Sequence, residues 1–260
     1  MNTRITVVTI TFNAAHCLER TLQSVLSQCH PYVEHLIIDG RSTDDTLALA
    51  RRYQADSRQL AATHEVVITS EPDRGIYDAM NKGLGRATGR YVVFLNAGDT
   101  FASPSTLEQV AALAADDVAV IYGDTDITDD QGRYLHPRRL RPPRRLSWRS
   151  FRQGMLVCHQ AFYARTDIAR RVPYDLHYRY SADVDWCIRV MREAEQQGLR
   201  LCNAGATLAC YTEQGATTRH HRASLRERFR VMARHYGLPV TLAMHAWFVL
   251  RAVGQKLRRP

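Results

Sequence analysis

The sequence lacks an apolar run of the roughly 20 residues that a membrane-spanning helix needs. Its first residues, MNTRITVVTITFN, lead straight into a strand-like pattern, without the basic and long apolar regions of a signal peptide. The six cysteines include no Cys-x-x-Cys pair, and we expect them to be reduced thiols. Together these absences predict a cytoplasmic protein.

Two common nucleotide-binding motifs are also absent. No G-x-G-x-x-G follows the first strand-like run, and the chain contains no Walker loop. The usual dinucleotide-binding and ATP-binding interpretations therefore lose support. Internal repeats and low-complexity tracts are missing as well, which leaves an ordinary globular chain with 45% apolar residues.

Acidic residues are scarce in two parts of the chain. The net charge is +9, and the excess lies in the tail, where ten Lys or Arg accompany a single acid, Glu227, from Arg219 onward. A second basic cluster, HPRRLRPPRRLSWRSFR at 136–152, has no acid. Such blocks indicate an anionic partner or, alternatively, two solvated Arg-rich surfaces. We expect no nucleic acid, because no recognition motif is present and aromatic residues are not interleaved as stacking platforms.

The first half of the chain does contain an alternation of strand and helix patterns. Strands are predicted at Arg4–Phe12, Val33–Asp39, Glu65–Ser70, Tyr91–Leu95 and Val118–Tyr122. Helices are predicted between them, the first with Asn13 as its cap, and later at Ala182–Glu195 and His220–Tyr236. The alternation predicts an α/β fold with a Rossmann-like, mainly parallel sheet flanked by helices.

Polar residues gather where three of the predicted strands end. They are Thr11-Phe12-Asn13, the stretch 39–44 (DGRSTD) and Asn96-Ala97-Gly98-Asp99. Ligands of doubly wound sheets bind at the carboxyl edge of the strands. Asp39 and Asp99 are therefore expected to face one crevice.

Five stretches resemble family 2 glycosyltransferases of the GT-A fold, in particular those of bacterial exopolysaccharide clusters such as the colanic acid type. They are VVTITFN, LIIDGRSTDDT, SEPDRGIYDAMNKGLGRATGRYVVFLNAGD, HQAFYAR and SADVDW, and they extend to about Trp186. The tail beyond Thr212 matches weakly. We expect a GT-A domain over residues 1–215 and a basic helical extension over residues 216–260.

The resemblance implies an inverting transfer of one sugar from a nucleotide-diphosphate sugar, with Mg²⁺ or Mn²⁺ on the diphosphate. It assigns Asp99 to the metal and Asp183 to the general base, with Asp185 as the alternative base. Contacts to the donor are expected from Thr11, Phe12, Asn13, Asp39, Arg74, Asn81, Asn96 and Ala97. For Arg74, a solvated turn position is an equal alternative.

The sequence departs from the family at the Asp-x-Asp region. Asn96 replaces the first Asp and Gly98 occupies the third position, so Asp99 is the single charge on the turn. Help from His220 or His221 is one expectation, and a catalytically weak nucleotide-sugar-binding protein is another. The Gln-x-x-Arg-Trp motif of processive synthases is absent, which favours addition of one sugar.

We expect a UDP-linked donor, with GDP- or dTDP-sugars as alternatives, and a glycan or polyprenyl-diphosphate-linked acceptor. The apolar stretch Val240–Leu250 is too short to span a bilayer and precedes several basic residues. It is either a helix lying on the inner face of the membrane, with Trp247 near the headgroups, or a helix packed on protein. The first alternative would make the enzyme a peripheral membrane protein.

Overall fold

The computed structural model describes residues 3–60, 64–212 and 221–257 of the chain. Four parallel strands form one half of its sheet, in the order β3-β2-β1-β4. Their bounds are Ile5–Thr11 (β1), Val33–Asp39 (β2), Glu65–Ser70 (β3) and Tyr91–Phe94 (β4). All seven residues of β1 and of β2 are buried, as in a strand covered on both faces.

The other half of the sheet is mixed. Strand β8 (Phe162–Arg165) runs antiparallel between β4 and β6, and β6 also pairs in parallel with the long strand β9. Strand β6 spans Val118–Thr128 and β9 spans Arg200–Thr212. Two short strands complete the sheet: β5 (Thr100–Phe101) pairs with β9, and β7 (Tyr134–Pro137) pairs with β6. The sequence predicted β6 only as far as Tyr122 and did not predict β9.

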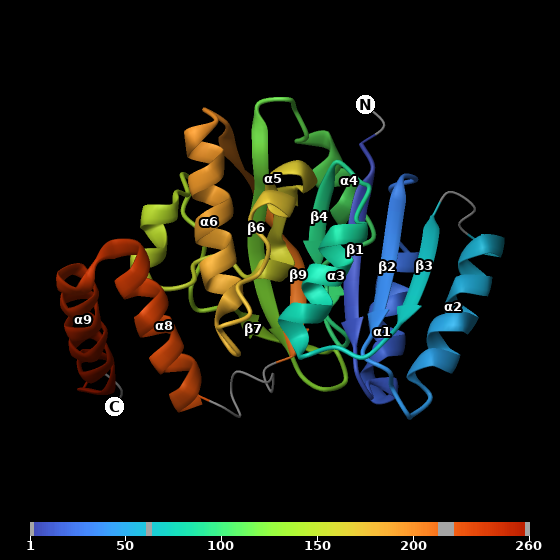
Figure 1. The fold of residues 1–260 in the computed structure, drawn as a ribbon, viewed down its shortest axis with the longest axis horizontal. Coiled ribbons are helices and arrows are strands. Elements are labelled where there is room, and N and C mark those ends of the chain that lie inside the picture. The colour runs from blue at the N-terminus through green and yellow to red at the C-terminus, as the bar shows by residue number, and fades with distance from the viewer. Residues whose placement is uncertain (1–2, 61–63, 213–220, 258–260) are drawn as a thin grey trace.

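Helices cover both faces of the sheet (Figure 1). One core lies between the sheet and α3, α5 and α6, and a second lies between the opposite face and α1 and α4. The bounds are Ala15–Leu26 (α1), Thr46–Leu60 (α2), Ile76–Arg86 (α3), Thr106–Ala112 (α4), Thr166–Arg171 (α5) and Ala182–Gln196 (α6). Two 3-10 turns, η1 (Trp148–Gln153) and η2 (His159–Ala161), precede β8.

The C-terminal segment forms a helical hairpin at one end of the molecule (Figure 1). Helix α8 (His221–Tyr236) turns at Gly237, whose φ is +81°, into α9 (Leu238–Leu257). The aromatic rings of Tyr236 and Trp148 stack 5.6 Å apart and join the end of α8 to η1. No helix in the described ranges combines the length and apolar character needed to cross a membrane. A domain boundary between residues 215 and 216 stays a prediction.

Candidate active site

The polar turn after β4 is braced by α1. Gly98 has a φ of +97°, a left-handed conformation that favours glycine, which explains a glycine at the third position. The Thr21 hydroxyl accepts a hydrogen bond from the Gly98 amide at 2.8 Å and donates one to the Asp99 carbonyl at 2.7 Å. Arg20 donates to the Gly98 carbonyl at 3.1 Å from its Nε. Two side chains of α1 therefore fix the backbone of the turn.

Asp99 and Asn96 have side-chain oxygens that can accept further hydrogen bonds. Asp99 is 8% exposed, and Gln160 donates to its Oδ2 at 2.9 Å. Burial raises the pKa of Asp99 to about 6, although the Gln160 hydrogen bond and the charge of His159 act in the opposite direction. The Oδ1 atom of Asn96 is buried without a hydrogen-bond partner among the described residues. A cation or a donor hydroxyl would satisfy both groups.

A divalent ion fits this turn only with help from its substrate. Within the described ranges, no three His, Cys, Asp or Glu side chains cluster closely enough to hold a metal. Asp99 would be the charged protein ligand, and phosphate oxygens and water would complete an oxygen shell suited to Mg²⁺ or Mn²⁺. His220 and the side chain of His221 lie outside the described residues.

The buried charge of Asp99 predicts a pH-dependent stability. The carboxyl group of an unfolded chain ionises near the model value of 3.8, whereas the folded one ionises near 6. Stability is therefore lost as the pH rises from the lower value to the higher one, by up to about 3 kcal/mol. In EDTA, Asp99→Asn should be more stable than wild type at about pH 8, and the difference should vanish near pH 4. Urea unfolding at both pH values measures it, and a constant difference would contradict the assignment.

Asp39 organises the loop that follows β2. Its carboxylate is fully buried and accepts hydrogen bonds from the hydroxyls of Thr11, Ser42 and Ser70 and from the amides of Arg41 and Ser42. Burial acts to raise the pKa of Asp39, but these donors outweigh it and hold the pKa below its usual value. Five donors fill the acceptor capacity of the group, so a nucleobase would have to replace one of them. The predicted base contact stays a prediction.

The residues after β1 close the same edge of the sheet. Phe12 is 65% exposed and directly follows the buried strand β1. Asn13 does not cap α1 as predicted; its backbone is left-handed, with φ 48°, and its Oδ1 accepts from the Thr43 amide at 2.8 Å. Asp44 instead accepts from the first amide of α1, that of Ala15, at 3.1 Å. The loops after β1 and β2 are thus tied together.

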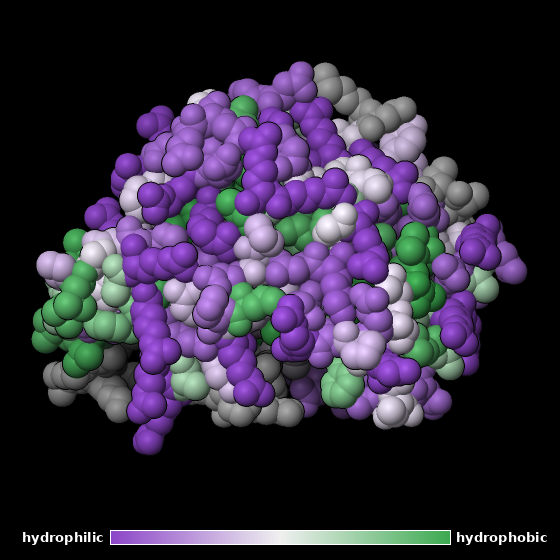
Figure 2. All heavy atoms as spheres, in the orientation of Figure 1, coloured by the Kyte–Doolittle hydropathy of each residue, from purple (hydrophilic) through white to green (hydrophobic). Residues whose placement is uncertain are grey.

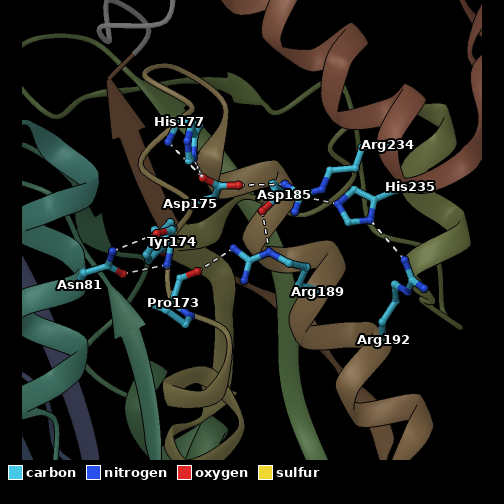
Figure 3. Close-up of polar contacts among 10 residues, drawn as sticks. All are labelled: Asn81, Pro173, Tyr174, Asp175, His177, Asp185, Arg189, Arg192, Arg234 and His235. Atoms are coloured by element: carbon cyan, nitrogen blue, oxygen red, sulfur yellow. Dashed lines mark hydrogen bonds and ion pairs between the residues drawn. The ribbon is translucent and has the colours of Figure 1, made fainter.

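Arg74 and Asn81, the two donor contacts predicted farther along the chain, have partners of their own. The Arg74 side chain is 80% exposed and pairs with Asp78 at 3.2 Å. Asn81 donates to the Tyr174 carbonyl at 2.9 Å and accepts from the Tyr174 amide at 2.7 Å (Figure 3). Asn81 therefore joins α3 to the loop before α6, and its donor contact stays a prediction, as does that of half-buried Ala97.

Asp183 lies in the first turn of α6 between two partners from other elements. The Tyr77 hydroxyl of α3 donates to its Oδ1 at 3.2 Å, and His159 Nδ1 of η2 lies 3.6 Å from its Oδ2. Burial acts to raise the pKa of Asp183, but His159 and the positive charge of Arg228 outweigh it and lower the pKa. The carboxylate is therefore ionised at neutral pH, as a general base must be.

His159 links Asp183 to the polar turn. Its Nε2 lies 3.1 Å from Asn96 Nδ2 while its Nδ1 faces the carboxylate of Asp183. The next residue, Gln160, holds Asp99. The turn η2 thus brings the predicted base and the predicted metal-binding turn into one site.

Asp185, the alternative base, is occupied on both oxygens. It is fully buried; Arg189 Nε donates to Oδ2 at 2.6 Å, and His235 Nε2 lies 2.7 Å from Oδ1 (Figure 3). Burial acts to raise the pKa of Asp185, but His235 and Arg189 lower it. A carboxylate with both oxygens engaged and no exposure is placed to hold structure together, whereas Asp183 keeps partial access.

A cluster of aromatic side chains packs around the segment that carries Asp183. Tyr77 stacks on Tyr174 at 5.5 Å, and Tyr174 stacks on Trp186 at 4.8 Å. Phe94 at the end of β4 meets both Tyr174 and Trp186 edge-on. Because these rings come from α3, β4, the loop and α6, they fix the position of Asp183 relative to the sheet.

Sequence analysis did not single out Tyr77 as a partner of Asp183, nor Gln160 as a partner of Asp99. Both lie inside stretches that carry the family resemblance, SEPDRGIYDAMNKG and HQAFYAR, and this position was the available signal. The parts of the tail that contact α6 carried no signal beyond the lone acid Glu227.

Comparison with known proteins identifies the class. The family model described as glycosyl transferase family 2 matches residues 6–172, most of the described sheet, and the chain belongs to this family. It is therefore a glycosyltransferase.

Similar curated proteins come from several bacteria. An uncharacterized glycosyltransferase of Mycobacterium tuberculosis H37Rv is 32% identical over 212 residues, 78% of this chain and 75% of that protein. A PGL/p-HBAD biosynthesis glycosyltransferase of the same organism is 32% identical over 70% of this chain and 68% of its own length. TuaG of Bacillus subtilis, named for teichuronic acid biosynthesis, is 38% identical over 36% of each chain.

Solved structures agree on the GT-A fold. Residues 1–349 of Staphylococcus aureus TarS, in complex with UDP-GlcNAc, match with a TM-score of 0.67 at 17% identity. The match covers 88% of this chain and 64% of the TarS fragment. The mannosyltransferase PcManGT of Pyrobaculum calidifontis, in complex with GDP-Man and Mn²⁺, matches with a TM-score of 0.62 at 19% identity, covering 98% and 80%. At these identities the likeness establishes the fold alone.

Proposed function

We propose that the protein transfers one sugar, with inversion, from a nucleotide-diphosphate sugar to a glycan acceptor of bacterial surface polysaccharide synthesis. The observation that carries the proposal is the single site in which His159 stands between ionised Asp183 and Asn96 of the polar turn. A base on one side and a turn suited to a diphosphate on the other are the two groups that such a displacement requires.

In the proposed reaction, the acceptor hydroxyl attacks the anomeric carbon of the donor sugar. A new bond forms between that carbon and the acceptor oxygen, and the bond to the diphosphate oxygen breaks. The hydroxyl proton passes to Asp183, while Tyr77 and His159 hold the carboxylate in place. The diphosphate leaves with the bonding electron pair, and a single in-line displacement inverts the anomeric centre.

Asp99 is the proposed ligand of Mg²⁺ or Mn²⁺, which would stabilise the charge that develops on the leaving diphosphate. The complex of PcManGT with GDP-Man and Mn²⁺ supports a divalent ion. Asn96 is proposed to contact the ribose through its unpartnered Oδ1. Thr11, Phe12, Asn13, Asp39, Arg74, Asn81 and Ala97 complete the proposed donor contacts.

We propose a UDP-sugar as the donor. The TarS fragment with UDP-GlcNAc supports this choice, while PcManGT with GDP-Man keeps a GDP-sugar as the alternative, with dTDP-sugars beside it. A thermal-shift panel of nucleotide sugars, with and without Mn²⁺, tests the proposal. A ligand at a hundred times its dissociation constant adds about 2.7 kcal/mol. If no nucleotide sugar raised the melting temperature, the proposal would fail.

A nucleotide-sugar-binding protein with weak catalysis is the second candidate. The observation in its favour is that the Asp-x-Asp region departs from the family pattern, so that Asp99 is its single charged residue. Slow release of nucleoside diphosphate from the donor in Mn²⁺ separates the two candidates. Release above the uncatalysed rate supports an enzyme, and tight binding without release supports the second candidate.

The acceptor is proposed to be lipid-linked, for example on polyprenyl diphosphate, at the inner face of the membrane. Figure 2 shows hydrophobic residues gathered over α9, where Leu238, Leu242, Trp247, Val249 and Leu250 are between 41% and 71% exposed. Arg222, Arg226 and Arg230 form an exposed row, one turn apart, on neighbouring α8. Apolar and basic surfaces side by side suit an anionic bilayer surface.

Deleting α9 tests the membrane contact. A chain ending at Gly237 should stay folded, because the joints of α8 to α6 and η1 remain, and should keep donor binding. It should lose most co-sedimentation with anionic liposomes, since each basic residue near the surface contributes about 1 kcal/mol and the apolar face adds more.

The matched control keeps α9 and changes two of its exposed apolar residues with Val249→Ser and Leu250→Ser, which should weaken liposome binding without loss of folding. Precipitation of the shortened chain would indicate that α9 packs on protein. Equal sedimentation of all three proteins would refute the membrane contact.

A further inference from the structure

One face of α8 packs on the segment that carries Asp183. Its residues recur every three or four positions, as on one side of a helix: Ser224, Glu227, Arg228, Val231 and His235. Ser224 is 2% exposed and Val231 is fully buried. Figure 1 shows α8 beside α6, on the side of the molecule that continues into α9.

Polar contacts fix this face next to the proposed base. The carboxylate of Glu227 accepts hydrogen bonds from two consecutive amides, those of Arg179 at 2.9 Å and Tyr180 at 2.7 Å. The Ser181 hydroxyl donates to the Ser224 carbonyl at 3.2 Å. The single acid of the basic tail thus holds the chain immediately before α6, only a few residues from Asp183.

Arg228 is the next residue along α8 and is half-buried. Its Nε is buried and makes no hydrogen bond, and no ion pair joins Arg228 to any residue in the described ranges. Arg189 and Arg234 of the neighbouring cluster are, by contrast, each paired with a carboxylate (Figure 3). The positive charge of Arg228 nevertheless helps to lower the pKa of Asp183.

A buried donor without a partner costs roughly 1–3 kcal/mol, and more when the group is charged. Such a group inside a protein calls for an explanation, and a ligand that pairs with it is one. Here the unpartnered Nε belongs to a cation close enough to Asp183 to lower its pKa. Under the proposed function, substrates with diphosphate groups meet beside Asp183. A planar guanidinium binds phosphate oxygens with two parallel hydrogen bonds, which few other side chains can do.

We propose that Arg228 binds a phosphoryl group of a substrate in the transfer site, and that α8 is therefore part of the active site rather than an appended tail. This inference rests on the proposed function, because it takes the diphosphate from the donor or from a lipid-linked acceptor. Both sources share one chemistry, an oxygen-rich anion with two or more negative charges. They differ in which substrate loses affinity when the cation is removed.

The test compares Arg228→Met with Arg228→Lys and with the control Arg52→Met, an exposed arginine on α2 outside both the transfer site and the proposed membrane surface. KM is measured for the nucleotide sugar and for one glycan presented on a diphosphate-linked or on a neutral alkyl carrier. Removal of a hydrogen bond to a charged group predicts a KM roughly 10- to 100-fold higher for the substrate whose phosphate Arg228 binds. Arg228→Lys should recover part of this loss, and Arg52→Met should match wild type.

The two carriers separate the sources. A loss confined to the diphosphate-linked acceptor assigns Arg228 to the acceptor, and an equal loss with both carriers, seen in the KM of the donor, assigns it to the donor. Unchanged KM values for all substrates in folded Arg228→Met would overturn the inference.

A binding measurement keeps the inference testable without turnover. Calorimetric titration with inorganic diphosphate should show weaker binding to Arg228→Met than to wild type and to Arg52→Met. Equal affinities for all three proteins would overturn the inference. If wild type bound diphosphate through Arg228 but transferred no sugar from any donor, the proposed function would fail while the anion site remained.

Discussion

Replacing Asp183 with Asn should reduce sugar transfer by roughly 10²–10⁴-fold, the usual contribution of a general base. The amide keeps the shape of the side chain and can still accept the Tyr77 hydrogen bond, so donor affinity should persist. Initial rates of transfer and calorimetric donor binding measure the two effects separately. A fall in kcat with an unchanged donor Kd is the expected result.

Asp185→Asn is the informative partner of this variant. It leaves Arg189 and His235 without a buried carboxylate, and removal of one member of a buried pair costs about 3–5 kcal/mol. The expected change is therefore in stability, with the folded fraction retaining transfer. Near-normal transfer by Asp183→Asn, together with loss of transfer in folded Asp185→Asn, would move the base to Asp185.

Replacing Asp99 with Ala should remove most of the Mn²⁺-dependent affinity for the nucleoside diphosphate. Changes even in the outer shell of a metal site cost roughly 10- to 100-fold in affinity, and Asp99 is the single charged group on the turn. Calorimetry with Mn²⁺ and with EDTA isolates the metal-dependent part.

Asn96→Ala is the control for Asp99→Ala on the same turn. Its effect should be milder, because an amide at this position contacts ribose in the proposed arrangement. It should also appear with and without metal. Equal Mn²⁺-dependent affinities for wild type and Asp99→Ala would refute the assigned role of Asp99.

The parallel half of the fold could be predicted from the sequence because its signals are local. The strands Val33–Asp39 and Glu65–Ser70 have the predicted bounds, since continuous β-branched and apolar residues are bounded by polar turns. Helix α6 was placed to within one residue, because its apolar residues recur with the helical period. The turn after Tyr91–Phe94 was predicted as a site from the same strand-end rule.

The mixed half was harder to predict, for reasons visible in particular residues. Strand β9 carries an interior Gly205 and is largely half-buried, so it lacks both an apolar run and a clean alternation. Asn13 looked like a helix cap, but its side chain instead bonds the loop after β2, a contact between distant segments. Local propensity cannot report such a choice, because the Thr43 amide that donates to Asn13 lies 30 positions along the chain.

The hydrogen-bond partners of the candidate site residues could not be predicted either, because they lie far away in the sequence. Gln160 and Asp99 are 61 positions apart, and Glu227 lies nearly 50 positions from the amides that it accepts. The sequence marked Glu227 as the lone acid of a basic tail without indicating its purpose. The pairing depends on α8 packing beside α6, which no periodicity within either helix encodes.

The central claim is an inverting transfer at the site formed by Asp183 and the Asn96–Asp99 turn. The most direct test is the anomeric configuration of the product, measured by proton NMR after incubation of the protein with an α-linked nucleotide sugar, Mn²⁺ and an acceptor. The predicted result is a β-linked product in wild type that forms roughly 10²–10⁴-fold more slowly with Asp183→Asn. An α-linked product, or undiminished β-linked product with Asp183→Asn, would contradict the account.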